Sequence, residues 1–393
     1  MVWTIARAVT ILSVFALVIA GSARAVFAQA APAAPDPPAE PTTLLDRMKE
    51  PDQGGGFHLT KHFAVVFGGI KSGSGIALGP AFSHKFANGS YTQVKAVYSI
   101  EKFYVLQARH DSQQFWDGRG SVVTRLRWQD APKLDVRRLG PDAPDLSVDY
   151  GERKTEGSTR LRLQIAPALR AGSGIGIEQY STRNGRIDLA DASGLPSVPR
   201  LPGLGTKPVF AHTFFSAAND TRTSPDYSRS GRLVEGAIHH YVDLHDNQDA
   251  FGRFEGTLQQ LIPTHGGKGV IELAAQTWLS LSDGERSVPF FLMPTLGGSN
   301  YLRGYQSYRF RDRHALLFKG EYRWAVHKMV DVAGLLEAGK VAPTVKGLRL
   351  SHMAESIGAG IRVHSKTSSL MDLDFARGRD GFKLTVSFGA GSF

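Results

Sequence analysis

The sequence predicts an all-β protein, a transmembrane antiparallel β-barrel that most simply has sixteen strands. From Phe57 onward, apolar and polar side chains alternate with a period of two, and Gly, Asn, Asp and Ser turns interrupt the pattern. Beyond the N-terminal region there is no apolar run of about 18 residues, the minimum for a transmembrane helix. The chain also ends on an alternating segment with aromatic residues, which is typical of the terminal targeting strand of such a barrel: Phe382, Phe388 and Phe393.

The two faces of the predicted strands differ in a way that favours a membrane barrel over a soluble sandwich or propeller. In residues 159–165 apolar side chains alternate with arginines and a glutamine, and residues 125–129 and 319–324 repeat this pattern. Large aromatic residues on one face and long charged side chains on the other suit a lipid-facing exterior and a wet lumen. The basic residues expected to line the lumen are Arg125, Arg127, Arg160 and Arg162.

Sixteen segments fit the strand pattern, and an even number is expected for a bacterial single-chain barrel. Closure into a ring is expected because an open sheet in lipid would leave backbone groups unpaired at its edges. Within residues 131–158, a weak segment near residues 146–150 is either a further strand or part of a long loop. The candidate strands are 62–70, 75–86, 91–100, 102–113, 119–130, 159–168, 172–182, 208–218, 231–243, 250–262, 269–281, 315–326, 329–341, 355–364, 369–377 and 382–393.

The N-terminal part of the chain has the composition of a targeting and linker region. Residues 1–30 resemble a secretory signal, with the positive charge of Arg7, a short apolar stretch and an Ala-x-Ala cleavage site at 28–30. Cleavage after Ala25 and an uncleaved anchor are the alternatives. Residues 31–56 begin with a Pro/Ala-rich linker and continue as a short helix or a tether, so that the barrel is expected to span 57–393.

Composition narrows the classes of partner. The chain has 393 residues, 43 of them glycine and none cysteine, and a formal net charge of +10. The absence of cysteine excludes disulfides and Cys-based metal sites. A basic chain is one mark of nucleic-acid binding, but here Lys and Arg are spread along the sequence without a dense run. We therefore interpret the charge as a cationic barrel interior and expect no nucleic-acid partner.

Chemical motifs for catalysis or metal binding are not evident. His239, His240 and His245 suggest a metal site, but neighbouring strand residues point to opposite faces, so the first two cannot share an ion. There is no G-x-S-x-G, Walker or H-E-x-x-H motif. We expect neither an enzyme nor a bound metal or cofactor.

A polar, Gly-rich segment, residues 296–313, interrupts the alternation and is too long for a plain turn. Long connections of this kind are usually functional. It contains the tetrad Leu302-Arg303-Gly304-Tyr305. At this tetrad the chain resembles the outer-membrane assembly-factor superfamily (BamA/TamA-like, the bacterial surface antigen family), whose sixth extracellular loop carries a hydrophobic-Arg-Gly-aromatic tetrad and folds back into the lumen.

Other elements of the family occur in the same order, which makes the resemblance more specific than the tetrad alone. An Asp-Thr-Arg turn begins at Asp220 and leads to Pro225 and Gly231. After the tetrad come Glu321-Tyr-Arg323, Gly334-Leu-Leu-Glu337-Ala-Gly339, Gly358-Ala-Gly360-Ile-Arg362 and Asp372-Leu-Asp374. The resemblance covers about residues 57–393 and implies a long loop six folded into the lumen.

The resemblance implies a latch between loop six and the barrel wall. The family's loop arginine docks against acidic residues of the twelfth and thirteenth strands, which here correspond to Glu321 and Glu337. Guanidinium and carboxylate groups form strong bidentate bonds, so Arg303 can hold the loop. Gly304 is expected to permit a tight turn and Tyr305 to pack against the wall. Glu337 departs from the family's Phe-x-Asp-x-Gly pattern by one methylene, and a structural brace is favoured over a moving gate.

The expected function follows from the resemblance. It implies an outer-membrane protein that inserts or translocates polypeptides or handles lipid, helped by a weak seam between the first and last strands. Because the segment before the barrel is short, we expect the family's periplasmic POTRA domains to be absent. The alternatives are an anion-leaning passive pore plugged by loop six and a structural surface-antigen barrel. Expected partners are outer-membrane lipid and lipopolysaccharide, the barrel assembly machinery for the protein's own insertion, and unidentified client polypeptides.

Overall fold

The computed structural model describes residues 55–142, 148–184, 201–245, 250–282 and 288–388, which all belong to one compact unit. The predicted signal peptide, most of the predicted linker and Phe393 lie outside these described residues. No helix within the described ranges is long and apolar enough to cross a membrane.

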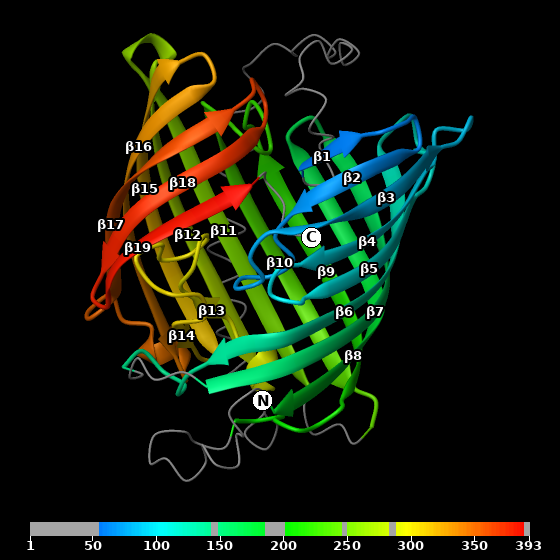
Figure 1. The fold of residues 1–393 in the computed structure, drawn as a ribbon, viewed down its shortest axis with the longest axis horizontal. Helices are drawn as coiled ribbons and strands as arrows, with labels where there is room; N and C mark the ends of the chain where they lie inside the picture. The colour runs from blue at the N-terminus through cyan, green and yellow to red at the C-terminus, as the bar shows by residue number, and fades with distance from the viewer. Residues whose placement is uncertain (1–54, 143–147, 185–200, 246–249, 283–287, 389–393) are drawn as a thin grey trace. The chain divides into compact units, whose positions relative to one another are not determined.

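The described chain forms a nearly closed ring of antiparallel strands that follow one another in chain order (Figure 1). Sixteen of them correspond one to one to the sixteen predicted strands, which confirms the predicted barrel. These strands are β2 (Phe63–Gly68), β3 (Ala77–Lys85), β4 (Tyr91–Ser99), β5 (Tyr104–Asp111), β6 (Gly120–Val136), β7 (Val148–Ala166), β8 (Leu169–Asn184), β9 (Val209–Asp220), β10 (Gly231–Asp243), β11 (Phe251–Thr264), β12 (Gly269–Leu281), β15 (His314–His327), β16 (Val330–Ala342), β17 (Ala354–His364), β18 (Ser369–Gly378) and β19 (Gly381–Phe388).

Three short strands and three short helices complete the described elements. Strand β1 (Gly55–His58) pairs with β2 ahead of the first predicted strand. Loop six is the whole connection between β12 and β15. Inside it, β13 (Thr295–Leu296) pairs with β14 (Phe310–Arg311), and this two-residue ladder closes the part of the loop that carries the tetrad. The 3-10 helices are η1 (His265–Gly267), η2 (Phe290–Leu292) and η3 (Val345–Gly347).

In its described residues, the ambiguous region 131–158 extends an existing hairpin and adds no strand. Strand β6 runs on to Val136 and β7 begins at Val148, so the described part of the weak segment, residues 148–150, is the start of β7. The physical reason is burial, because Leu134 and Tyr150 are 2% and 1% exposed. Tyr150 packs edge-on against Phe290 of loop six, with ring centroids 4.8 Å apart. Loop six thus covers the hairpin beyond the predicted strand ends.

Side-chain alternation follows the predicted faces. On β6, Leu126 and Trp128 are exposed by 60% and 37%, whereas Val123 and Gln129 are 2% and 6% exposed and point inward. The same contrast recurs around the ring, since many large apolar residues are exposed and many arginines and carboxylates are buried. An apolar exterior with a polar interior is the pattern of a membrane barrel.

The antiparallel order defines two ends of the ring. Loop six joins β12 to β15 at one end, which we call the outer end. The β9–β10, β11–β12 and β17–β18 turns lie at the opposite end, which we call the inner end. Towards the outer end, loop residues such as Phe290 and Met293 pack against inward-facing wall residues to form a buried apolar cluster. This packing places loop six within the ring of strands (Figure 1).

Candidate functional site

Loop six folds into the lumen because its apolar residues pack against inward-facing residues of β15 and β16. Leu296, Leu302 and Phe310 are at most 2% exposed and form one cluster with Leu317 and Val341. Burying a leucine or phenylalanine side chain contributes about 1.5–3 kcal/mol. This apolar anchor brings the tip of the loop against the wall.

The tip has a defined backbone conformation. Gly297 and Gly298 have φ values of 110° and 106°, which glycine adopts without steric cost. A Cβ at Gly297 would lie 2.2 Å from the carbonyl oxygen of Gln306. Leu302 also has a positive φ, of 55°, which is uncommon for a residue with a Cβ. The buried side chain of Leu302 holds this turn, and the turn presents the next residue to the wall.

Arg303 is bound by three carboxylates on three strands. Its backbone N–H and its Nε donate to Glu337 on β16, at 2.6 and 3.0 Å. Its Nη1 donates to Glu321 on β15 at 3.1 Å and to Asp374 on β18 at 3.3 Å. The side chain of Glu337 is 0% exposed and that of Asp374 is 4% exposed. The loop is therefore tied to a wide stretch of the wall through one side chain.

A second arginine completes the cluster from the wall itself. Arg362 on β17 donates to Glu321 at 2.8 Å and forms an ion pair with Asp374 at 2.7 Å. Gly360 and Asp374 are direct partners in the β17–β18 register, which places Arg362 and Asp374 on the same inner face. Arg303 and Arg362 thus share two carboxylates, Glu321 and Asp374.

The cluster holds equal numbers of positive and negative side chains. Two arginines face three carboxylates, and Arg323 on β15 adds a third positive charge 3.9 Å from Glu321. Burial acts to lower the pKa of Arg303, but the charges of Glu337, Glu321 and Asp374 outweigh it and raise that pKa above its usual value. Removing one partner from such a buried cluster typically costs about 3–5 kcal/mol, because the remaining charge is left uncompensated.

Gly304 and Tyr305 seat the tip on β17 and β18. The N–H of Gly304 donates to the Ser356 hydroxyl at 2.8 Å. A Cβ at Gly304 would lie 2.5 Å from backbone atoms of Arg377 and Gly378, so the reason for glycine is close approach to the wall. The predicted tight turn is also present, because the Tyr305 N–H donates to the Leu302 carbonyl at 2.9 Å and closes a turn around Arg303 and Gly304, although the positive φ in the tetrad belongs to Leu302. Tyr305 is 2% exposed, and its hydroxyl accepts a bond from the backbone N–H of Arg379 at 3.1 Å.

The structure brings together the five residues predicted for the loop-six latch, and it adds three residues that the sequence analysis did not assign to the latch. The five predicted residues are Arg303, Gly304, Tyr305, Glu321 and Glu337. Glu337 reaches Arg303 despite its longer side chain, because the carboxylate spans both the backbone N–H and Nε. The added residues are Ser356, Arg362 and Asp374. The sequence could have pointed to Arg362 and Asp374, because both occur in motifs shared with the family. Both also occupy positions that face the lumen in the alternation of their strands.

The four basic residues predicted to line the lumen share one face of the wall. In the β6–β7 register Val123 pairs with Arg160 and Arg125 with Ser158, so the arginines of both strands face inward. Arg127 donates to Gln129 at 2.7 Å, and Arg160 lies 5.3 Å from the Phe214 ring. Arg162, nearer the inner end, lines a cavity of about 360 Å³ together with Arg119 and Arg170.

Other predicted residues have clear positions. Phe382 on β19 is 58% exposed and stacks on Phe375 with ring centroids 5.1 Å apart, so it belongs to the outer surface. The side chains of Phe388 and Phe393 lie outside what the structure describes. His239 faces inward, and its Nδ1 lies 3.0 Å from Nε2 of His212. Across the described ranges, no three His, Cys, Asp or Glu side chains are grouped as a metal site.

A membrane barrel with an inward-folded loop held by an arginine defines the class of protein. Residues 119–393 match the Omp85 superfamily domain. Because this match covers most of the chain, the protein belongs to the Omp85 superfamily, and it is an integral protein of the bacterial outer membrane. The predicted resemblance and location are confirmed. None of the curated proteins matches this sequence.

Solved structures with a similar fold have very different sequences. BamA from Haemophilus ducreyi lacking POTRA domains 1–3 has a TM-score of 0.63 and 14% identity, with 84% of this chain and 70% of that chain covered. CdiB from Escherichia coli has a TM-score of 0.56 and 11% identity, with 85% and 63% covered. CdiB from Acinetobacter baumannii has a TM-score of 0.51 and 10% identity, with 84% and 59% covered. The chain thus spans less than two thirds of either CdiB, and these identities support the fold alone.

Proposed function

We propose that this protein aids the insertion or translocation of polypeptides, or the handling of lipid, at the outer membrane. The observation that supports this best is the docked loop six in an Omp85 barrel. Arg303 has three carboxylate partners there, at 3.0–3.3 Å. The site is built to hold a loop in place, which is a structural task.

The position of the latch suggests how the barrel works. Its wall partners, Glu321, Glu337, Arg362 and Asp374, lie on four consecutive strands, β15 to β18. A charged cluster that bridges four strands keeps this wall rigid. In our proposal, client polypeptides or lipids therefore engage a more deformable part of the ring, at the seam between the first and last strands.

The proposal includes the parts of the chain and their partners. Residues 1–30 act as a signal peptide, residues 31–56 as a linker, and residues 57–393 as the barrel. The barrel contacts outer-membrane lipid and lipopolysaccharide, and the cellular barrel assembly machinery inserts it. It acts on polypeptides or lipid, and it acts without a cofactor.

Depletion of the protein in its own cells tests this function. The levels of other outer-membrane barrels are measured by quantitative mass spectrometry, and several are expected to fall. Wild-type protein and an Arg313→Ala control, altered in the same loop away from the latch, should restore them, whereas Arg303→Ala should not. Unchanged barrel levels and an unchanged lipid distribution after depletion would contradict the proposal.

An anion-leaning pore plugged by loop six is the second candidate, and the inward arginines of β6 and β7 favour it. Single-channel conductance of the purified barrel distinguishes it. A plugged pore predicts low conductance that rises strongly in Arg303→Ala, with anions carrying most of the current. Negligible conductance in both proteins argues against a pore, and together with normal barrel levels after depletion it would indicate a structural surface antigen.

A further inference from the structure

The turn that joins β9 to β10, residues 221–230, folds inward and crosses part of the ring at the inner end. We call this segment the strap. Its Tyr227 N–H donates to the Thr367 carbonyl at 3.3 Å, and the Ser224 hydroxyl donates to the same oxygen. Thr367 lies in the β17–β18 turn, and the four strands β11, β12, β15 and β16 separate β10 from β17 in the ring. The strap therefore crosses the inner end directly, from the β9–β10 turn to the β17–β18 turn, and bypasses the four strands between them.

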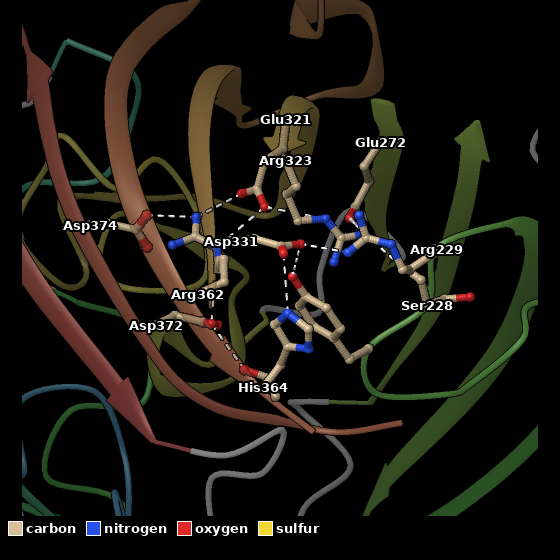
Figure 2. A network of polar contacts seen from close by, with 12 residues as sticks. Ser228, Arg229, Glu272, Glu321, Arg323, Asp331, Arg362, His364, Asp372 and Asp374 are labelled. Carbon is tan, nitrogen blue, oxygen red and sulfur yellow. Dashed lines mark hydrogen bonds and ion pairs between the residues drawn. The ribbon is translucent and has the colours of Figure 1, made fainter. Parts of the chain in front are cut away.

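The strap is fixed by a buried carboxylate of the wall, Asp331 on β16 (Figure 2). The Tyr227 hydroxyl and Nη1 of Arg229 both approach Asp331 Oδ2 at 2.6 Å, and Nε2 of His364 lies 3.2 Å from Oδ1. The Asp331 side chain is 0% exposed. The Tyr227 ring also stacks on His364, with centroids 4.0 Å apart. Two of the three partners of this buried carboxylate belong to the strap, so Asp331 holds the strap against β16. We call Asp331 and these three partners the lock.

Arg323 connects this lock to the loop-six latch. Its Nη2 donates to the Ser228 carbonyl of the strap at 2.7 Å, and its guanidinium lies 4.6 Å from the Tyr227 ring. On its other side, Nε lies 3.9 Å from a Glu321 oxygen. Figure 2 shows Glu321 between Arg362 and Arg323, with Asp374 beside Arg362 and Asp331 below Glu321 in this view. Hydrogen bonds and ion pairs thus connect the inner-end strap, through Arg323, to Glu321, which also holds Arg303.

We propose that the strap is a second internal latch and that it is coupled to loop six through Glu321 and Arg323. Inside the lumen, charges interact more strongly than in water, so displacing Tyr227 and Ser228 changes how Arg323 and Arg362 share Glu321. Glu321 is also a partner of Arg303, so release of the strap weakens the hold on loop six. Coupling of this kind is reciprocal, and release of loop six loosens the strap.

Through this coupling, a change at the inner end of the barrel alters how firmly loop six is held, although loop six enters the lumen from the outer end. The strap and loop six share contacts in one network of side chains. Energetic coupling requires such a network, whose equilibrium both segments influence. The coupling does not depend on whether the protein moves polypeptides, lipid or ions. Its test is therefore made on the purified full-length barrel, and failure of the test leaves the proposed cellular function unaffected.

Hydrogen–deuterium exchange with mass spectrometry measures both segments in one experiment. The amides of Gly297, Gly298 and Tyr305 are hydrogen-bonded within loop six and report its tip. Asp331→Asn removes the charge of the lock with little change in shape, and Tyr227→Phe removes only the hydroxyl. Each is expected to speed exchange about fivefold or more in the strap and also in the loop-six tip.

Two further variants make the result specific. Glu156→Gln alters a buried carboxylate on β7 that pairs with Lys154, away from both segments, and should leave exchange in the strap and the tip unchanged. Arg323→Gln removes the connecting charge, so adding Asp331→Asn to it should speed exchange in the strap but no longer in the tip. Faster exchange in the strap with an unchanged tip in both Asp331→Asn and Tyr227→Phe would overturn the coupling. Unchanged exchange in the strap would overturn the lock.

Discussion

The Arg303→Ala substitution tests the latch most directly. It removes the Nε bond to Glu337 and the Nη1 contacts to Glu321 and Asp374, at 3.0, 3.1 and 3.3 Å. Glu337, with a side chain that is 0% exposed, keeps only the backbone N–H of residue 303 as its partner from the loop. A buried charge left without its counterion costs about 3–5 kcal/mol, and we expect the free energy of unfolding to fall by that amount.

Urea unfolding of the purified barrel in lipid vesicles measures this change. The Trp278 ring packs edge-on against Tyr301 in loop six, with centroids 5.3 Å apart, so its fluorescence reports whether the loop is docked. Arg313→Ala, in the same loop without an ion pair to the latch, serves as the matched control and is expected to cost less than about 1 kcal/mol.

A double-mutant cycle makes the reasoning refutable. If Arg303 and Glu337 act on each other, combining Arg303→Ala with Glu337→Gln should cost less than the sum of the two single changes, by about 1 kcal/mol or more. Glu337→Asp should also destabilise, because the shorter side chain cannot keep both the 2.6 Å and the 3.0 Å bond to Arg303. Additive effects, or a cost for Arg303→Ala no larger than that of the control, would show that the latch does not hold the loop.

Two other predictions concern the tip and the lumen. Gly304→Ala would place a Cβ 2.5 Å from the backbone of residues 377–378, so the tip should lift and be cut faster by added protease, whereas Gly334→Ala, whose Cβ meets nothing within 4 Å, should leave the cleavage rate unchanged. Equal cleavage rates in both variants would refute the close approach. Replacing Arg125 and Arg160 by glutamate in the Arg303→Ala variant should shift the reversal potential in a salt gradient towards cation preference. An unshifted potential would place these side chains away from the conducting path.

Most of the ring was predictable because strand faces have a simple period. On β6 and β7, the alternation of arginines with leucines showed which positions face the lumen and which face the lipid. Turn residues marked the ends of the strands. The extension of β6 to Val136 and the early start of β7 at Val148 were not predictable in the same way. Its inward residues, such as Leu134 and Tyr150, are apolar because loop six covers them, and a local pattern carries no information about a distant cover.

The site was predictable only as far as motifs reached. Family resemblance led to Arg303, Glu321 and Glu337, but it did not show that Asp374 also contacts the arginine. Strand parity alone places Asp374 in the lumen without saying which cation lies opposite. The strap was not foreseen at all, because the Asp-Thr-Arg turn at residue 220 predicts a turn and gives no sign that its later residues cross to β16 and β17.

The spacing of the latch along the chain bears on how the barrel is assembled. Arg303 precedes its partners Glu321, Glu337 and Asp374 by 18, 34 and 71 residues. The entropy lost in closing a loop grows only slowly with its length, so these closures differ by about 1 kcal/mol. All of them lie within the last third of the sequence. That third can consolidate its own ionic cross-links during biogenesis, before the N-terminal strands take their places in the sheet.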